Sequence, residues 1–535
     1  MRHGRPFWIT GTALLALLVA PFVGLAQDQA RGHHAQRSRY IRSLHESGAP
    51  FVTGTPSTCA RMTALIIPNT QITSAQVVPA SDGLPEYCSV VGVVSPAVGF
   101  EVRLPTDWNQ KLYFAGNGAF AGSIPDTDLE TAFGLTRGYA TAATDTGHQA
   151  DPFDASWALN NRPAEIDYGY RSVHVTVGVA KIIINSYYGQ APHFSYFDGC
   201  SKGGQQGLEE AQQYPDDFNG IADGSPAFDF TGIFTAANWN MQALHATADS
   251  SEIPPEKVPV IGAAVLASCD AVDGLVDGLI DDPRRCSFDP DILRCLGGDA
   301  PDCLTGKQVR ALKKIYAGPT GAFGPQLFPG LPVGGETVEW DTWLINTPDA
   351  PSLAFALQDQ FFRYLAFRVD DPNFDWATFD FDKDPPRMRF MGGILNATNT
   401  DLSGFRKAGG KLLMYHGWSD PIIAATRTID YYKSVRRELG PKKTKQFARL
   451  FMAPGMSHCT SGSGPFAFDY FTALEGWVEQ GIAPDSMVAY HFDDNGNVDR
   501  TRPLCAYPQV ARYQGHGSID DAANFRCVEP EPDSD

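Results

Sequence analysis

The sequence is short of basic residues: 42 Lys and Arg stand against 61 Asp and Glu, which gives a formal net charge of −19. A surface of this sign repels phosphate backbones, so a nucleic acid is excluded as a partner. Internal repeats and low-complexity tracts are also lacking. A chain of 535 residues is too long for one simple core, and we expect a large domain with an insertion.

Long apolar runs are missing everywhere except at the N-terminus. Arg2 and Arg5 precede an apolar run that extends from Phe7 to about residue 20, and small residues follow at Gly24 and Ala26. This pattern predicts a secretory signal peptide over residues 1–26, with a retained membrane anchor as the alternative. We therefore expect a secreted or periplasmic protein that has no membrane association after cleavage.

No CxxC pair occurs among the ten cysteines, which argues against a zinc site built from thiolates. An even cysteine count in an exported protein indicates disulfides instead. Pairing of near neighbours is simplest, and it leaves Cys200 and Cys459 for each other. The four local pairs are then Cys59–Cys88, Cys269–Cys286, Cys295–Cys303 and Cys505–Cys527.

The stretch DGCSKGG, residues 198–204, places Ser201 in a turn flanked by glycines, as in the turn that presents the nucleophile of α/β-hydrolases. Strand-forming residues precede it, and a helical pattern follows until Pro215. The backbone N–H of Lys202 is one natural donor to an oxyanion. For the second donor we choose Gly118, in the glycine-rich loop after an expected strand over Leu112–Phe114; a plain turn is the alternative.

The segment PGMSHC provides a candidate base, His458, directly before Cys459. A disulfide between Cys200 and Cys459 would bring this imidazole to the Ser201 hydroxyl, although two unrelated buried cysteines remain the alternative. Asp420 follows an expected strand over Lys411–Tyr415 and is the candidate third member. The order Ser, Asp, His is that of α/β-hydrolases. Asp420 as a mere turn residue is the competing interpretation.

A second histidine, His416, lies on the same loop as Asp420 and competes with His458 for the role of the base. It lacks a cysteine neighbour, and we expect its role to be structural.

These motifs, together with YFAGNGAFAG, DTGH, DYGYRSVH and CDAVDGLVDGLIDDPRRC, resemble the tannase and feruloyl esterase family. The resemblance extends over most of the mature chain. It implies an α/β-hydrolase core with a large inserted lid domain, a serine triad joined by a disulfide, and a calcium site in the lid. Lys202 departs from the family pattern, in which a smaller polar residue often follows the serine.

The pattern of residue types along the chain agrees with that architecture. An α/β pattern runs to about residue 228, an aromatic- and cysteine-rich segment follows, and the α/β pattern then resumes. We predict a first part of the core over residues 27–228, the lid over 229–402 and the second part of the core over 403–535. Nucleophile and acid lie on opposite sides of the insertion, so the insertion should cap the site.

The lid contains an acidic loop in which aspartates three and four apart alternate with glycines, as a hard cation requires. The family resemblance implies Ca²⁺ ligation here, by carboxylates and by the backbone carbonyls of the intervening leucines, with a structural role. The alternative is a solvated acidic turn closed by a disulfide. The five candidate ligands are Asp270, Asp273, Leu275, Asp277 and Leu279.

We therefore predict a secreted serine esterase in which Ser201 attacks, His458 transfers the proton and Asp420 orients the imidazole. The substrate is a small ester of an aromatic acid, because flat rings stack on aromatic walls, although the aromatic residues of the lid could equally be its own core. A terephthalate monoesterase is the alternative, and it would need a cation such as Arg363, Arg368 or Lys202 at the site. A peptidase with the same triad and a non-catalytic phenol- or carbohydrate-binding protein are the remaining rivals.

Overall fold

The computed structural model describes residues 52–124, 128–245, 251–322, 324–347 and 350–530. The predicted signal peptide over residues 1–26 lies outside these described residues. No helix in the described part of the chain is long and apolar enough to cross a membrane.

A mixed sheet of nine strands forms the centre of the fold, in the order β11-β10-β9-β8-β6-β7-β4-β3-β2. The strands from β11 to β7 are parallel to one another, whereas β4, β3 and β2 form an antiparallel extension. This arrangement is an α/β-hydrolase fold, as the sequence predicted. The strand bounds are β2 Thr70–Val78, β3 Tyr87–Val94, β4 Val98–Pro105, β6 Lys111–Ala115, β7 Ala140–Thr144, β8 Phe194–Cys200, β9 Gly220–Gly224, β10 Lys411–Gly417 and β11 Ala448–Ala453.

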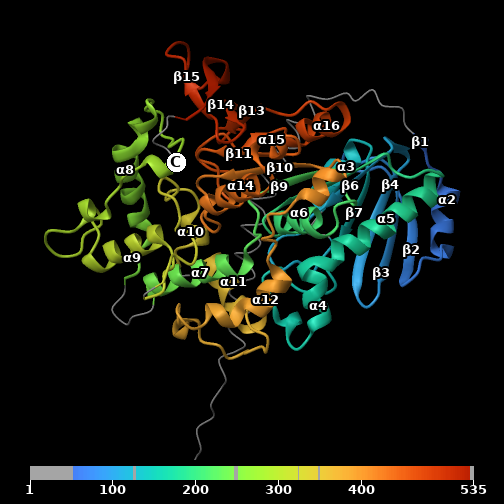
Figure 1. The fold of residues 1–535 in the computed structure, drawn as a ribbon, viewed down its shortest axis with the longest axis horizontal. Helices are drawn as coiled ribbons and strands as arrows, with labels where there is room; N and C mark the ends of the chain where they lie inside the picture. Colours follow the sequence, from blue (N-terminus) through green and yellow to red (C-terminus); the bar gives the residue numbers. More distant parts are fainter. Residues whose placement is uncertain (1–51, 125–127, 246–250, 323, 348–349, 531–535) are drawn as a thin grey trace, which may run out of the picture.

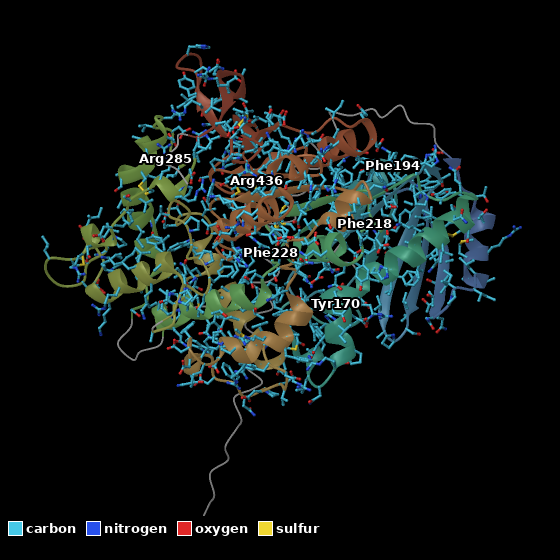
Figure 2. All side chains as sticks on the ribbon, viewed as in Figure 1. Tyr170, Phe194, Phe218, Phe228, Arg285 and Arg436 are labelled. Carbon is cyan, nitrogen blue, oxygen red and sulfur yellow. A yellow bond between two sulfur atoms is a disulfide. The ribbon has the colours of Figure 1, made fainter. Side chains whose placement is uncertain are left out.

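Neighbouring residues of the central strands point to opposite faces of the sheet, and each face has its own buried cluster. Phe114 and Phe197 belong to one cluster, while Tyr113 and Tyr196 belong to the other. Helices cover both faces, which is why these strands are apolar on both sides. Figure 2 shows side chains packed throughout this core, and Phe218 is one of the labelled residues that belong to it. The helices are α3 Asp128–Thr136, α5 Ser172–Tyr188, α6 Lys202–Gln213, α14 Ala425–Leu439 and α16 Tyr470–Gln480.

The register of the parallel strands brings the candidate site to one edge of the sheet. Cys200 at the end of β8 pairs with Gly224 of β9, and Gly224 pairs with Tyr415 of β10. The carboxyl ends of these strands therefore coincide, although β9 and β10 are separated by the whole insertion. In Figure 1, the green α6 and β9 lie beside the orange β10 and α14. Loops that follow these strands meet at the edge where α/β folds bind ligands.

The insertion between β9 and β10 is helical, and no named strand occurs in its described residues. In Figure 1 its colour changes from green through yellow to light orange along the chain. One of its two apolar clusters includes Phe120, Tyr168 and Ile423 from the core, so the lid packs onto the loops around the site. The longer helices are α7 Phe230–His245, α8 Val258–Cys269, α9 Gly306–Ala317, α11 Leu353–Tyr364 and α12 Arg389–Leu395.

All ten cysteines form disulfides, and all five predicted pairings are confirmed. The C-terminal disulfide, Cys505–Cys527, joins β14 to β16 within a small antiparallel region. Its strands are β12 Ala467–Phe468, β13 Ser486–Phe492, β14 Val498–Cys505, β15 Val510–Tyr513 and β16 Phe525–Val528.

Candidate active site

Ser201 occupies the turn between β8 and α6 in a strained backbone conformation, with φ 63° and ψ −117°. A residue other than glycine rarely adopts such a positive φ, and strain of this kind concentrates at functional turns. The turn is tight enough that a Cβ atom on Gly199 would lie 2.7 Å from the backbone of Gly203. Only glycine fits at position 199, which explains the pattern that singled out Ser201.

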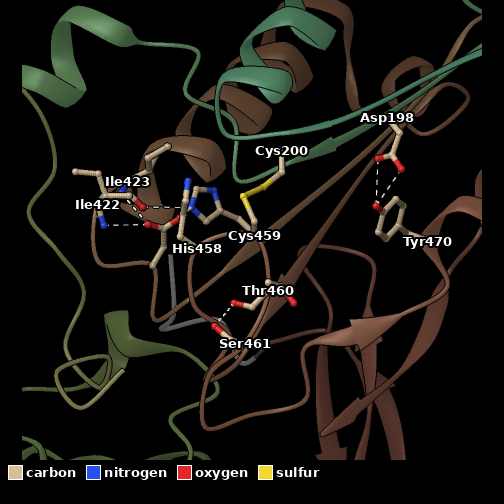
Figure 3. Close-up of a disulfide and its surroundings, with 11 residues drawn as sticks. Asp198, Cys200, Ile422, Ile423, His458, Cys459, Thr460, Ser461 and Tyr470 are labelled. Carbon is tan, nitrogen blue, oxygen red and sulfur yellow. Dashed lines mark hydrogen bonds and ion pairs between the residues drawn. A yellow bond between two sulfur atoms is a disulfide. The ribbon is translucent and has the colours of Figure 1, made fainter. Parts of the chain in front are cut away.

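The disulfide between Cys200 and Cys459 fixes the neighbours of Ser201 and His458 to each other, with Cα atoms 5.9 Å apart. Each of the two functional residues lies one backbone step, about 3.8 Å, from its half-cystine. Figure 3 shows the disulfide directly beside His458. Two segments that are 259 residues apart in sequence are thereby held in one place.

Asp420 is fully buried, and its carboxylate accepts four hydrogen bonds. Nδ1 of His458 donates at 2.7 Å and the backbone N–H groups of Ile422 and Ile423 donate at 3.0 and 2.8 Å. Burial by itself would raise the pKa of Asp420, but the imidazoles of His458 and His416 outweigh it and hold the pKa well below its ordinary value. Asp420 therefore fixes its turn and orients the imidazole of His458 at once, and its catalytic role stays a prediction.

His416 lies on the far side of Asp420 and is completely buried. Its Nε2 is 3.1 Å from Oδ2 of Asp420, and its Nδ1 is 2.8 Å from the hydroxyl of Thr428. Both ring nitrogens are thus engaged away from the nucleophile. This arrangement supports a structural role for His416.

The glycine-rich loop after β6 lies against the start of α6. A Cβ atom on Gly203 would lie 3.2 Å from the carbonyl oxygen of Asn117, and the side chain of Gln206 accepts the N–H of Asn117 at 2.9 Å. Gly118 is exposed, and a Cβ atom there would meet nothing within 4 Å. The loop is therefore anchored by α6 while Gly118 borders open space. Its role as an oxyanion donor, like that of the Lys202 N–H, stays a prediction.

The side chain of Lys202 turns into the protein, where only 1% of the residue is exposed. Its Nζ donates to the carbonyl of Tyr168 at 2.8 Å and to the side chain of Gln205, and it lies 3.8 Å from the centre of the Tyr168 ring. Burial lowers the pKa of Lys202 to about 7, against the opposing effect of Glu209. This residue thus ties the start of α6 to the segment around Tyr168.

The family profile described as tannase and feruloyl esterase matches residues 83–528. The chain belongs to the tannase and feruloyl esterase family. An uncharacterized esterase from Xanthomonas campestris is 39% identical, with 91% of this chain and 94% of that protein aligned. A mono(2-hydroxyethyl) terephthalate hydrolase from Piscinibacter sakaiensis is 32% identical over 85% of this chain and 87% of its own.

Among solved structures, feruloyl esterase B from Aspergillus oryzae superimposes with a TM-score of 0.80 at 28% identity. The match covers 88% of this chain and 100% of that one. The likeness therefore includes the lid as well as the core, which agrees with the resemblance inferred from the motifs.

Two lid residues close to His458 were not predicted from the sequence as part of the site. Glu339 accepts hydrogen bonds from the hydroxyls of Ser457 at 2.6 Å and Ser461 at 2.8 Å, so it holds the loop on both sides of His458. Trp343 lies with its ring centroid 5.3 Å from that of the His458 imidazole. Nothing local in the sequence distinguishes either residue, since Glu339 is 118 positions away from Ser457.

The acidic loop of the lid curls as predicted, because Gly274 and Gly278 adopt φ values of 95° and 80°. Asp270 accepts from the N–H groups of Asp277 and Gly278 at 3.1 and 3.0 Å. Asp273 accepts from those of Leu275 and Asp281 at 2.9 and 3.3 Å. These bonds fold the loop and leave part of the acceptor capacity of each carboxylate oxygen unused.

The loop also carries a concentration of negative charge. Burial and the neighbouring Asp273 raise the pKa of Asp281 to about 7, while Arg502 from β14 opposes this shift and forms an ion pair with Asp277. Hard oxygen donors crowded in this way suit a divalent cation. The carboxylates of Asp270, Asp273 and Asp277 do not form a group within 4.8 Å of one another in the described structure. They would therefore have to move closer together to bind a single cation.

The cations considered for a terephthalate monoester are engaged elsewhere. Arg363 pairs with Asp359 at 2.8 Å and donates to the carbonyl of Pro372 at 2.8 Å. The guanidinium of Arg368 lies 5.1 Å from the Phe390 ring centre. Together with the buried Lys202, all three cations named for that alternative therefore contact other parts of the protein.

Proposed function

We propose that this member of the family is an exported serine esterase that hydrolyses esters of aromatic acids. The observation that carries the proposal is the coupling of a strained Ser201 to the His458–Asp420 pair through the Cys200–Cys459 disulfide. A binding protein without activity would have no need of a strained serine or of an Asp420 kept ionised beside the imidazole.

In the proposed reaction, Oγ of Ser201 attacks the ester carbonyl carbon while Nε2 of His458 takes the hydroxyl proton. The carboxylate of Asp420 keeps the proton of Nδ1 in place and stabilises the imidazolium. The N–H groups of Lys202 and Gly118 hold the negative oxygen of the intermediate. His458 returns its proton to the departing alcohol, and a water molecule activated in the same way releases the acid and regenerates Ser201.

Trp343 supports an aromatic acyl group. Most aromatic residues of the lid pack against each other: Phe234 stacks on Phe361 with centroids 4.4 Å apart, and Phe362 packs on Phe379 at 4.8 Å. These rings form the core of the lid. Trp343 also packs against this cluster, but its ring lies beside the imidazole of His458, where a flat acyl group could stack on it.

We also propose that the acidic loop binds a structural Ca²⁺ through Asp270, Asp273 and Asp277, with the carbonyls of Leu275 and Leu279. The charge repulsion around Asp281 supports this assignment, because a cation would relieve it. When bound, the ion supplies charge compensation to the lid and takes no part in ester cleavage. Five disulfides support export to an oxidising compartment.

The test compares the wild type with Ser201→Ala on four substrates: methyl ferulate, methyl gallate, a chlorogenate-type ester and a terephthalate monoester. We expect the variant to lose at least about 10⁴-fold in kcat and to melt at an unchanged temperature. Among the substrates, esters without a free carboxylate should be cleaved fastest. Residual turnover near the wild-type level would remove Ser201 from the mechanism, and a preference for the terephthalate monoester would favour the alternative substrate.

A matched aryl amide in the same assay addresses the peptidase alternative. We expect the amide to be cleaved at least about 100-fold more slowly than the ester, since the amine is the poorer leaving group and nothing in the site is aimed at it. Equal rates would assign a peptidase.

A further inference from the structure

His174, Glu210 and Asp217 form a cluster that the proposed esterase mechanism does not use. His174 lies on α5, Glu210 lies near the end of α6, and Asp217 lies in the loop that leads to β9. One potential ligand atom from each residue lies within 4.8 Å of those of the other two, and it is the one such group found among the described residues. Three separate segments therefore converge, as Figure 1 shows for α5 and α6 on the same side of the sheet.

Glu210 is the unusual member of the cluster. Only 1% of the residue is exposed, and neither carboxylate oxygen has a hydrogen-bond partner. A buried carboxylate without a partner is costly, and one that faces a second carboxylate needs either a proton or a cation between them.

The other groups around the cluster leave this requirement unmet. Nδ1 of His174 is 2.6 Å from Oδ2 of Asp217, and the ring stacks on Tyr214 with centroids 3.8 Å apart. Nζ of Lys181 donates to the backbone carbonyl of Asp217. Lys181 forms no hydrogen bond with the carboxylate of Glu210.

We propose that His174, Glu210 and Asp217 bind a Zn²⁺ ion. One imidazole nitrogen and two carboxylates make a three-ligand set of the kind zinc takes, with water as the fourth ligand. Mg²⁺ and Ca²⁺ prefer six or more oxygen ligands and suit this set less well. All ten cysteines are in disulfides, so no thiol competes for the ion.

Zinc binding requires a small adjustment of the cluster. Bonds of about 2.0–2.1 Å in a tetrahedron place ligand atoms about 3.3 Å apart. The imidazole nitrogen and the Asp217 oxygen, now 2.6 Å apart, must therefore separate slightly. The side chain of His174 is 42% exposed, which gives it freedom to turn and gives the ion a path from solvent.

The ion would link α5 to the C-terminal end of α6, the helix that directly follows Ser201. Glu210 is nine residues further along, about 13 Å at the helical rise, so the zinc is too far away to take part in ester cleavage. Its effect is to hold α6, and hence the nucleophile turn, against the neighbouring helix and loop.

The experiment uses the tag-free mature protein, stripped with a chelator and then saturated with Ca²⁺ so that the acidic loop is satisfied. Calorimetric titration with Zn²⁺ should show one equivalent bound with micromolar or tighter affinity, together with a rise in melting temperature. Co²⁺ in place of zinc should give the visible absorption of a tetrahedral site with nitrogen and oxygen ligands. His174→Ala and Glu210→Gln should each weaken zinc binding at least about tenfold and remove the cobalt signal.

The matched control is His491→Ala. His491 also pairs with an aspartate, Asp499, at 2.6 Å, but it belongs to no cluster of three ligands in the described structure. This variant should bind zinc like the wild type. The proposal is overturned if the wild type binds no zinc under these conditions, or if His174→Ala binds it unchanged; in that case a proton shared by Glu210 and Asp217 satisfies the pair. His174 is exposed enough that its variant tests the site even if Glu210→Gln fails to fold.

Discussion

The Cα atoms of Cys200 and Cys459 are 5.9 Å apart, although 259 positions separate them in the chain. Their bond joins the part of the core before the insertion to the part after it, and it holds the loop of His458 against the turn of Ser201. A cross-link of this span restricts the unfolded chain strongly.

Replacement of both Cys200 and Cys459 by alanine should lower the free energy of unfolding by a few kcal/mol, up to about 5 kcal/mol in the chain-entropy treatment. It should also reduce kcat, because the His458 loop loses its attachment to the nucleophile turn. Urea unfolding and steady-state kinetics measure the two effects. The control is the double alanine variant of Cys295 and Cys303. The disulfide that it removes lies in the lid and joins residues only 8 positions apart. If both double variants retained full kcat, the bridge would have no positioning role.

Glu339 is a positioning residue in our account, because it holds Ser457 and Ser461 on either side of His458. Glu339→Ala should lower kcat about tenfold with little change in KM, the loss expected for a hydrogen bond to a charged group. Glu339→Gln, which keeps one acceptor oxygen, should recover part of the rate. Glu256→Gln, at an exposed lid position, serves as the control. A proportional change in KM without loss of kcat would instead place Glu339 in substrate binding.

Lys202 should make stability depend on pH in a direction that can be measured. Its pKa falls from 10.5 to about 7 on folding, so the unfolded chain binds more protons between these values. The cost of burying the ammonium is therefore full below pH 7 and declines as the pH rises through this interval. The stability of Lys202→Met relative to the wild type should be higher at pH 6 than at pH 9, by on the order of 2 kcal/mol.

Urea midpoints of Lys202→Met and the wild type at both pH values provide the measurement. The comparison cancels the contributions of titrating groups that do not interact with Lys202. Glu209 does interact with it, and its own pKa is raised to about 7 by burial, so Glu209→Gln is introduced into both proteins to isolate the effect of Lys202. A difference that is constant across the interval would show that the Lys202 ammonium keeps its ordinary pKa.

Removal of Ca²⁺ should lower the melting temperature more than it slows the initial rate of ester hydrolysis. The ion would hold the lid loop, whereas the segments of Ser201 and His458 are held together by the Cys200–Cys459 disulfide, which a chelator does not break. Asp273→Asn should abolish the calcium response, and His174→Ala should preserve it, so the calcium and zinc proposals are separable. An unchanged melting temperature after thorough ion removal would leave the acidic loop as a solvated turn.

Much of the candidate site could be predicted because it depends on local chain geometry. A serine between Gly199 and Gly203 specifies a turn too tight for other residues at position 199, and the structure shows that turn with φ 63° at Ser201. The strand before Asp420 was predicted two residues too short: β10 continues to Gly417, since its buried residues extend to the end of the paired β11.

The sequence by itself determined the hydrolase fold, the family and the five disulfides, because these depend on the order of short motifs and on the number and spacing of cysteines. Only the tertiary structure decided that Lys202 points into the core, that Glu339 holds the loop of His458 and that Glu210 faces His174 without a hydrogen-bond partner. Such contacts join side chains from segments with no pattern in common. They depend on the direction in which each side chain leaves its helix or loop after packing, and that direction is set by the whole core.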